Sequence, residues 1–285
     1  MSYNLVDIGA NLTHPSYKED LAEVIKRAKQ AGLSKIMVTG TCLESVESAY
    51  KLSNEYNGYL YFTSGVHPHD AKDWKVETGT KITEYSQKPN CVAIGECGLD
   101  FNRNFSPQEV QKTVFEEQVK IACQLQKAMF IHERDAFDDL NLILDKYETD
   151  LPPIVIHCFT GTAEQAIKYI EKGYYIGLTG YLWKDRSENG IRCALRSGNL
   201  PIDKLLLETD APYMFCKVDD KKVPLEVREK LTEKAKSLHK FCNFKRNEPC
   251  GLASSCEMIA AFANVSPEEL ANVTTSNAKR IYMLE

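Results

Sequence analysis

The sequence predicts an α/β fold, a single (β/α)8 TIM barrel, and three observations support this prediction. Eight short apolar segments alternate with segments of helical periodicity along the chain. The length of 285 residues suits such barrels, which run to about 250 residues as one domain. Polar residues follow several of the apolar segments directly, and the carboxyl ends of barrel strands are where chemistry takes place.

The apolar segments have the length and composition of strands that are buried on both faces. The expected strands cover residues 5–9, 35–40, 61–67, 91–96, 129–132, 154–158, 174–179 and 205–208. Helices are expected at about 18–31, 46–52, 74–86, 106–125, 136–147 and 162–171. Gly32 provides a stop for the first helix, and Ser106 is expected to cap the long fourth helix, with Pro107 at its first position.

The regular alternation ends after the eighth strand, in a basic insertion at about 213–247 within the predicted domain of residues 1–285. Residues 217–246 hold ten Lys or Arg and five Asp or Glu, a local charge of +5. Because the insertion leaves the barrel at its active end, it is interpreted as a basic flap. A solvated amphipathic helix is the alternative.

Composition limits the function classes. With 35 Lys and Arg against 40 Asp and Glu, the net charge of −5 argues against a globally basic nucleic-acid-coating protein. The ten cysteines include no C-x-x-C pair, which favours a reduced compartment. No leader pattern or membrane-spanning run is present in the sequence, so we expect a cytoplasmic protein, with a nuclear pool as an alternative. The oligomeric state is left open, with a monomer favoured.

Five strand ends carry side chains that bind metal ions or move protons. The residues are His67, Glu96, His132, His157 and Asp210. Carboxylates favour Mg²⁺ or Mn²⁺ and imidazoles favour Zn²⁺, so the residues leave the identity of the ion open. A bound divalent ion activates water, which makes hydrolysis the expected reaction class.

Six motifs together resemble the TatD family of metal-dependent deoxyribonucleases. They are DIGANL at 7–12, GVHPHD at 65–70, IGECGLD at 94–100, HCFTG at 157–161, ETDAPY at 208–213 and RNEP at 246–249. The resemblance covers essentially the whole chain. It implies a barrel of the metal-dependent hydrolase type, a divalent ion, and hydrolysis of phosphodiester bonds in DNA from the 3′ end. Single-stranded DNA or frayed ends are the implied partners, with RNA as a further candidate.

The resemblance also implies roles for individual residues. Glu96, His132, His157 and Asp210 match the family's metal ligands, and Asp210 is the expected base for the attacking water. His67 and His69 match catalytic histidines near the substrate phosphate, where an imidazole donates a hydrogen bond or relays a proton.

The first strand departs from the family pattern Asp-x-His-x-His. Gly9 and Asn11 occupy the two imidazole positions, which leaves Asp7 and Asn11 as an additional metal site or as a second shell. An amide is a poor substitute for an imidazole toward a first-row ion, so we expect one firmly bound ion and a second bound weakly or only with substrate. Glu133 adds a carboxylate after the fifth strand.

Other polar residues receive structural interpretations. His14 is expected in a loop and His239 is expected to be exposed within the insertion. Glu208 is expected either to be buried and paired with another residue beneath the site or to be a catalytic group. Arg246 and Glu248 are expected to anchor the start of the last barrel helix.

Substrate contacts are predicted from charge and aromatic character. Arg103, Lys221 and Lys222 are candidates for phosphate contacts, and Tyr181 and Trp183 for stacking on a base. Phe101, Phe159 and Tyr213 also follow strand ends, although aromatic residues in barrel loops more often pack than stack.

Two other readings compete with a nuclease. The same metal and water could hydrolyse an aminoacyl ester on tRNA or a small cyclic amide. A barrel that only binds a ligand is disfavoured, because all four ligand positions hold competent residues.

Overall fold

A computed structural model describes residues 3–285. Its strands are β1 (Leu5–Ala10), β2 (Leu33–Val38), β3 (Leu60–Ser64), β4 (Cys91–Asp100), β5 (Met129–Arg134), β6 (Ile154–Ile156), β7 (Tyr175–Leu178) and β8 (Leu205–Leu207). They form one sheet in chain order from β1 to β8, and helices separate successive strands. The pairs β3–β4, β4–β5, β5–β6 and β7–β8 are parallel. This confirms the predicted (β/α)8 class.

The contacts divide the chain into two compact units, which we describe separately. The terminal unit comprises the chain up to Ile36 and Cys158–Arg280, and the central unit comprises Met37–His157 and Ile281–Glu285. The expectation of a single domain spanning the chain therefore stays a prediction.

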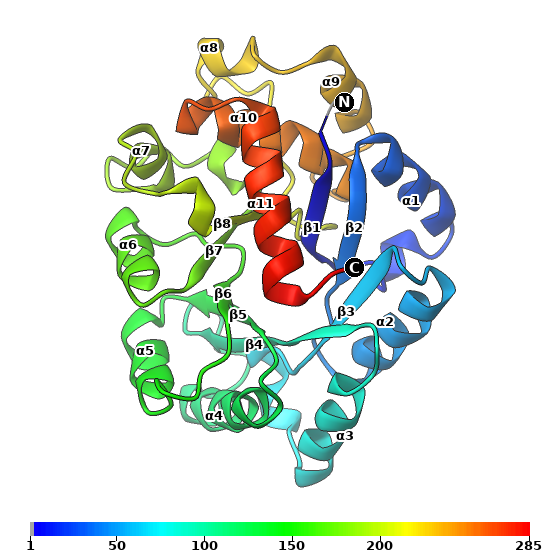
Figure 1. Ribbon diagram of the computed structural model, residues 1–285, viewed down its shortest axis with the longest axis vertical. Coiled ribbons are helices and arrows are strands. Elements are labelled where there is room, and N and C mark those ends of the chain that lie inside the picture. The colour runs from blue at the N-terminus through cyan, green and yellow to red at the C-terminus, as the bar shows by residue number, and fades with distance from the viewer. Residues whose placement is uncertain (1–2) are drawn as a thin grey trace. The chain divides into compact units, whose positions relative to one another are not determined.

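The central unit contains β3 to β6 and the helices that cover them. These are α2 (Leu43–Glu55), α3 (Val76–Ser86), α4 (Gln108–Leu125) and α5 (Phe137–Asp145). Figure 1 shows α2 beside β3, with α3 and α4 near β4. Phe62, Phe115 and Phe130 are fully buried in this unit and form part of its apolar core.

Strand β4 is longer than the sequence predicted. Glu96 was expected at the end of the strand, but β4 continues to Asp100 and pairs with β5 as far as Arg134, so that prediction was wrong. The register shifts between Gly95 and Cys97, which makes Glu96 the extra residue of a β-bulge. A bulge redirects the extra side chain, and the Glu96 amide donates to Gly40 O at 2.8 Å.

Glycines permit this course of β4. Gly95 and Gly98 have φ of 146° and 143°, a region that L side chains rarely adopt. A Cβ at these positions would overlap the carbonyl oxygens of Phe130 and His132. The Gly-x-x-Gly spacing around Glu96 is thus a requirement of the close approach between β4 and β5.

The terminal unit contains β1, β7 and β8. Its helices are α1 (Leu21–Gln30), α6 (Ala163–Glu171), α7 (Ile191–Arg196), α8 (Leu225–Arg228), α9 (Glu233–His239), α10 (Leu252–Ala263) and α11 (Pro267–Tyr282). A bridge between Ala10 and Ala211 places the end of β1 beside the segment that follows β8.

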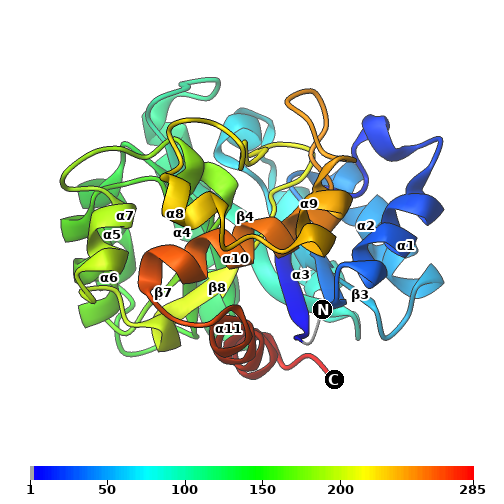
Figure 2. The same ribbon diagram turned by 90° about the horizontal axis from the view of Figure 1, so that it is seen from above.

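The insertion at 213–247 packs on α10 through α8 and α9, as Figure 2 shows. Val223, Val227, Ala235 and Leu238 are buried, and most of the basic side chains face solvent. His239 is buried with 8% exposure, so the expectation that it is exposed was wrong. The apolar spacing that buries the helix also buries this histidine near its end.

Two further observations concern the helices. Helix α4 has Pro107, not Ser106, at its N-cap position, which corrects the predicted cap. The Ser106 hydroxyl instead donates to His69 O at 2.8 Å and accepts from Lys72 N at 3.0 Å. Within residues 3–285, no helix is long and apolar enough to cross a membrane.

Candidate metal centre and active site

Three imidazoles converge on the bulged Glu96 in the central unit. Glu96 Oε1 lies 2.8 Å from His157 Nε2, 3.0 Å from His132 Nδ1 and 3.2 Å from His67 Nε2. Glu96 and His157 are buried, whereas the side chains of His67 and His132 are 12% and 20% exposed. The structure therefore brings together four residues that the sequence predicted, at a site with one accessible side.

The imidazoles determine the charge of Glu96. Burial opposes its ionisation, but His157, His67 and His132 outweigh burial and hold the pKa of Glu96 well below its ordinary value. For His67, burial dominates and lowers the pKa of the imidazole to about 4. At neutral pH the centre thus contains an ionised carboxylate and a neutral His67.

His67 and His132 are held in different ways. His67 Nδ1 accepts the backbone N–H of His69 at 3.1 Å, so the neutral ring carries its proton on Nε2, which faces Glu96. His132 places Nε2 3.5 Å from Asp100 Oδ2, and its Nδ1 faces Glu96. For His132, the Asp100 carboxylate behind the ring is the arrangement that orients metal-binding histidines. For His67, the protonated Nε2 is a hydrogen-bond donor.

The donor set fits a divalent ion. One ligand atom each from His67, Glu96 and His132 lies within 4.8 Å of the others. His67 lies close enough to be a ligand, but its Nδ1 accepts the His69 N–H and its Nε2 carries the proton, so neither nitrogen offers a free lone pair. Glu96, His132 and His157 then supply one carboxylate and two imidazoles, donors that suit a first-row ion.

Asp100 is the main site residue that sequence reasoning missed. It is 1% exposed, and its Oδ2 accepts from His69 Nε2 at 2.8 Å. Burial raises the pKa of Asp100, but the nearby His132 imidazole and hydrogen bonds from Arg103 N and His69 outweigh burial and lower it. A carboxylate closing an apolar strand, the same signal that pointed to Glu96, could have identified Asp100.

Two buried glutamines of α4 also escaped prediction. The Gln118 side chain accepts from Val66 N at 2.7 Å and donates to Val66 O at 3.0 Å, next to His67. The Gln111 side chain bonds to Asp100 N and O at 2.8 and 3.0 Å. Each glutamine amide bonds to both the backbone N–H and the backbone C=O of one residue. Helix α4 therefore positions the chain at the ends of two strands.

In the terminal unit, Asn11 and Asp7 serve the segment around Asp210. Asn11 Nδ2 donates to Asp210 Oδ1 at 3.0 Å. Asp7 Oδ2 lies 2.6 Å from Thr209 Oγ1, and Asp7 Oδ1 accepts from Thr209 N at 2.9 Å. Burial raises the pKa of Asp7 to about 8 despite these hydrogen bonds. These contacts favour supporting roles for Asp7 and Asn11.

The remaining polar predictions have structural partners. Glu208 is fully buried and accepts the Cys158 backbone N–H. Glu133 accepts from Ala136 N at 2.8 Å at the start of α5. His14 lies in a loop and accepts from Ser16 N. Arg246 pairs with Asp20 at 2.8 Å and with Glu248 at 3.0 Å, just before Pro249 opens a short 3-10 turn (Pro249–Gly251).

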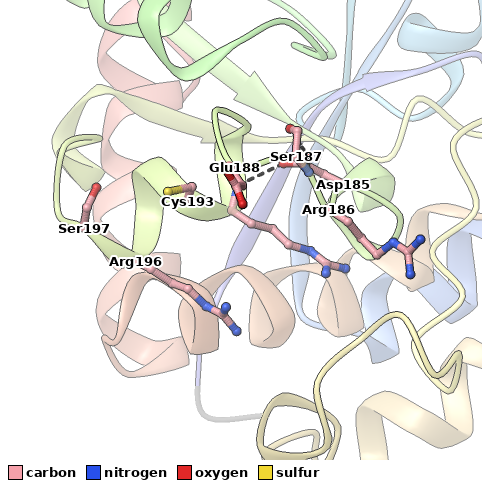
Figure 3. A pocket seen from close by; sticks show the side chains of 8 residues that line it. Asp185, Arg186, Ser187, Glu188, Cys193, Arg196 and Ser197 are labelled. Atoms are coloured by element: carbon pink, nitrogen blue, oxygen red, sulfur yellow. Dashed lines mark hydrogen bonds between the residues drawn. The ribbon is translucent and has the colours of Figure 1, made fainter.

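The predicted substrate contacts differ in accessibility. Arg103, Lys221 and Lys222 are exposed, Tyr181 is half-buried, and Trp183 is only 8% exposed. Figure 3 shows a pocket lined by residues of α7 and the preceding loop. The guanidinium of Arg192, which lines this pocket, donates to the carbonyls of Leu182, Trp183 and Lys222. These bonds hold Trp183 in the protein interior.

An exposed aromatic ring lies at the central-unit site itself. Phe105 is 61% exposed, and its ring meets His69 edge to face with centroids 4.7 Å apart. Phe101, which the sequence offered as a candidate ring, is half-buried, and Phe105 was not predicted. Its position in a polar loop four residues later carries no periodic signal.

This chain has relatives among known proteins, both in sequence and in structure. The family model described as "TatD related DNase" matches residues 6–283. The "3'-5' ssDNA/RNA exonuclease TatD" of Citrobacter rodentium is 38% identical over 278 residues, covering 98% of this chain and 97% of that protein. Its counterpart in Rahnella sp. is 37% identical over 280 residues and covers 98% of each chain. The crystal structure of a TatD family hydrolase from Entamoeba histolytica has a TM-score of 0.85 at 28% identity, with complete coverage of both chains.

Proposed function

Because the chain belongs to the TatD-related DNase family, we propose that it is a 3′–5′ exonuclease that hydrolyses phosphodiester bonds of single-stranded DNA, and of RNA. The observation that carries the proposal is the convergence of His157, His132 and His67 on Glu96. A divalent ion bound at such a centre polarises a phosphoryl oxygen and lowers the pKa of bound water.

We propose Glu96, His132, His157 and Asp210 as the residues that hold this ion. Mg²⁺ or Mn²⁺ is the proposed ion, with Zn²⁺ as the alternative, and the two imidazoles shift the preference from Mg²⁺ toward Mn²⁺. Asp210 is also the proposed base: its carboxylate is oriented by Asn11 and accepts a proton from the attacking water.

The two remaining histidines act on the substrate phosphate in this proposal. His67 keeps its proton on Nε2 because Nδ1 is occupied by His69 N–H, so it donates a hydrogen bond to a phosphate oxygen. His69 is oriented by Asp100 through Nε2, and that carboxylate stabilises the imidazolium when His69 carries a proton for the leaving oxygen.

Substrate binding is proposed to combine stacking with charge. Phe105 offers an exposed ring beside His69, where a nucleotide base can stack without regard to sequence. Arg103, in the same loop, contributes a charge toward the strand. The proposed location of this activity is the cytoplasm.

Product analysis on labelled oligonucleotides tests the proposed function. Chelator-treated protein is given Mg²⁺, Mn²⁺ or Zn²⁺ and incubated with 5′-labelled single- and double-stranded DNA, with RNA and with a mischarged tRNA. A ladder that shortens one nucleotide at a time from the 3′ end is expected. Release of the amino acid without DNA cleavage would favour the aminoacyl-ester alternative, which the names of the relatives do not favour.

A further inference from the structure

The basic insertion carries an exposed aromatic ring in the turn of a hairpin. Asn243 and Arg246 form an antiparallel bridge, in which Asn243 N donates to Arg246 O at 2.9 Å, so Phe244 and Lys245 make up the turn. Phe244 is 67% exposed, and Lys245 is also exposed. Figure 2 shows this hairpin in orange, projecting beyond α9. The proposed exonuclease mechanism uses neither side chain.

Two further rings fix the orientation of Phe244. Its centroid lies 4.9 Å from that of Phe215 and 6.1 Å from that of Trp183, at interplanar angles of 74° and 65°. Such edge-to-face contacts hold the ring in place. Most of the Phe244 side chain stays exposed despite them, so the ring can stack on another planar group. We call Phe244, Phe215 and Trp183 the aromatic platform.

Phe215 rests on a packed, buried group of side chains. Its ring stacks on His239 with centroids 5.2 Å apart, and His239 Nε2 lies 2.6 Å from Cys216 O. Cys242 N donates to His239 O at 2.9 Å, and the sulfurs of Cys242 and Cys250 are 3.9 Å apart. We call the buried residues His239, Cys242 and Cys250 the His239 cluster. Its packing fixes the position of Phe215 and hence of the platform.

Positive charges lie beside the exposed ring. Lys222 is exposed and places its Nζ 5.2 Å from the centroid of Trp183. Its backbone is fixed, because the buried guanidinium of Arg192 donates to the carbonyls of both Lys222 and Trp183. Lys245 is the neighbour of Phe244 in the turn. Proteins that bind single-stranded nucleic acid combine an exposed ring with flanking cations in this way.

The hairpin is hydrogen-bonded to the segment that carries Asp210. Asn247, which directly follows the hairpin, donates its backbone N–H to Pro212 O at 2.8 Å and its Nδ2 to Thr209 O at 3.3 Å. Phe215 follows Asp210 by five residues, so their Cα atoms are at most about 18 Å apart. At roughly 3.4 Å per nucleotide of a stacked strand, this span corresponds to about five nucleotides.

We propose that the aromatic platform stacks on an internal base of a single-stranded nucleic acid, up to about five nucleotides from the 3′ end that is cleaved. This inference rests on the proposed exonuclease function and adds a second subsite to it. Lys222 and Lys245 attract the phosphates on either side of the stacked base. Because every base has a π-face, the subsite binds without regard to sequence and favours longer strands.

Fluorescence anisotropy with 5′-labelled DNA tests the platform in chelator-containing buffer, where no cleavage takes place. Phe244→Ala should raise the Kd for an octanucleotide by about tenfold, the loss of one stacked base, and Phe244→Tyr should restore it. A blunt duplex, whose bases are already stacked, should bind wild type and Phe244→Ala equally. Phe241→Ala is the matched control with unchanged Kd, since it removes an exposed ring of the same insertion that lies over Arg27. Unchanged affinity of Phe244→Ala for the octanucleotide would assign the ring to a protein contact and overturn the proposal.

Cleavage kinetics locate the stacked base. In Phe244→Ala, kcat/KM should fall by about tenfold on the octanucleotide and stay unchanged on a dinucleotide, which has no internal base. An abasic position moved along the octanucleotide should abolish the difference between wild type and Phe244→Ala at one internal position and not at the 3′ end. An equal loss on the dinucleotide would overturn the proposal, because the variant would then disturb Asp210 itself. Binding that depends on Phe244 without any cleavage would refute the exonuclease function and keep the platform, whereas 3′ cleavage that is independent of Phe244 would do the reverse.

Discussion

The Glu96 centre of the central unit and the His239 cluster of the terminal unit both combine imidazoles with anionic or ionisable groups, but they differ in access and donor type. Around Glu96, oxygen and nitrogen donors meet beside His69, which is half-buried, and Phe105, which is exposed. Around His239, sulfur and nitrogen donors are closed off by packing, with Phe215 stacked on the ring at 5.2 Å. The accessible Glu96 centre can admit a ligand, whereas the thiols and the imidazole around His239 belong to the packed interior of the terminal unit.

Removing carboxylates should have the largest effect and should separate the two regions. We expect Glu96→Ala and Asp210→Asn each to lower kcat by about a thousandfold or more, because several kcal/mol of transition-state stabilisation depend on the ion. Circular dichroism should be unchanged, because the backbone pairing of β4 with β5 uses neither side chain. Glu109→Gln, on the exposed face of α4, is the control. Near wild-type activity of both variants in chelator-treated buffer would refute a catalytic metal.

Within the Glu96 centre, His67 and His132 should respond differently. His67→Gln should lower kcat by about a hundredfold, the effect of one lost donor to a developing charge, while Mn²⁺ affinity stays unchanged. His132→Gln should weaken Mn²⁺ binding by at least about tenfold. Calorimetric titration with Mn²⁺ and steady-state kinetics measure both quantities. If His67→Gln loses Mn²⁺ affinity as strongly as His132→Gln, the tautomer assignment is wrong.

Phe105 tests whether the open side of the centre receives a base. Phe105→Ala should raise KM for single-stranded DNA by about tenfold at constant kcat, and Phe105→Tyr should restore it, because one stacked base contributes about 1–3 kcal/mol. Phe241→Ala is the matched control, since Phe241 is 50% exposed and lies over Arg27 instead. An oligonucleotide with an abasic 3′ end should bind wild type and Phe105→Ala equally. A persisting difference would assign the effect to loop structure.

The buried carboxyls of the two units predict opposite responses to pH. Imidazoles keep the pKa of Glu96 low, whereas burial raises the pKa of Asp7 to about 8. A group whose pKa is raised in the folded state stabilises the fold fully below its unfolded pKa of about 4. This stabilisation is lost as the pH rises toward 8. Asp7→Asn should therefore flatten the decline of Tm between about pH 5 and pH 8. Thermal scans of both proteins across this range measure it, and an unchanged slope would exclude Asp7 as the cause.

Charges of the insertion should have the smallest effect. The double variant Lys221→Gln with Lys222→Gln should raise KM for DNA by about twofold. It should also reduce the slope of log affinity against log salt, because binding releases fewer counterions when phosphate contacts are lost. Titration of DNA binding at several salt concentrations measures the slope. Lys234→Gln, an exposed change on α9, serves as the comparison. An identical slope in all three proteins would show that the insertion only packs on α10.

The prediction of the fold succeeded because its signals are local. Alternating apolar strands and amphipathic helices leave a period in the sequence, and the motifs around His67, Glu96 and His157 are contiguous in the chain. The same reasoning missed Asp100 as a partner of His69, because that hydrogen bond joins residues 31 positions apart. It also misjudged His239, whose charged neighbours in sequence are not its neighbours in space.

The sequence by itself determined the barrel class, the family resemblance and most of the side chains that carry the chemistry, because each depends on residue type and short spacing. The tertiary structure decided how those side chains act. The bulge that aims Glu96 follows from the pairing of β4 with β5, and the tautomer of His67 follows from the backbone turn at His69. The spacing of Cys242 and Cys250 arises in the same way, from packing of the insertion against α10. Such geometry depends on contacts between segments distant in the chain, and no local pattern encodes it.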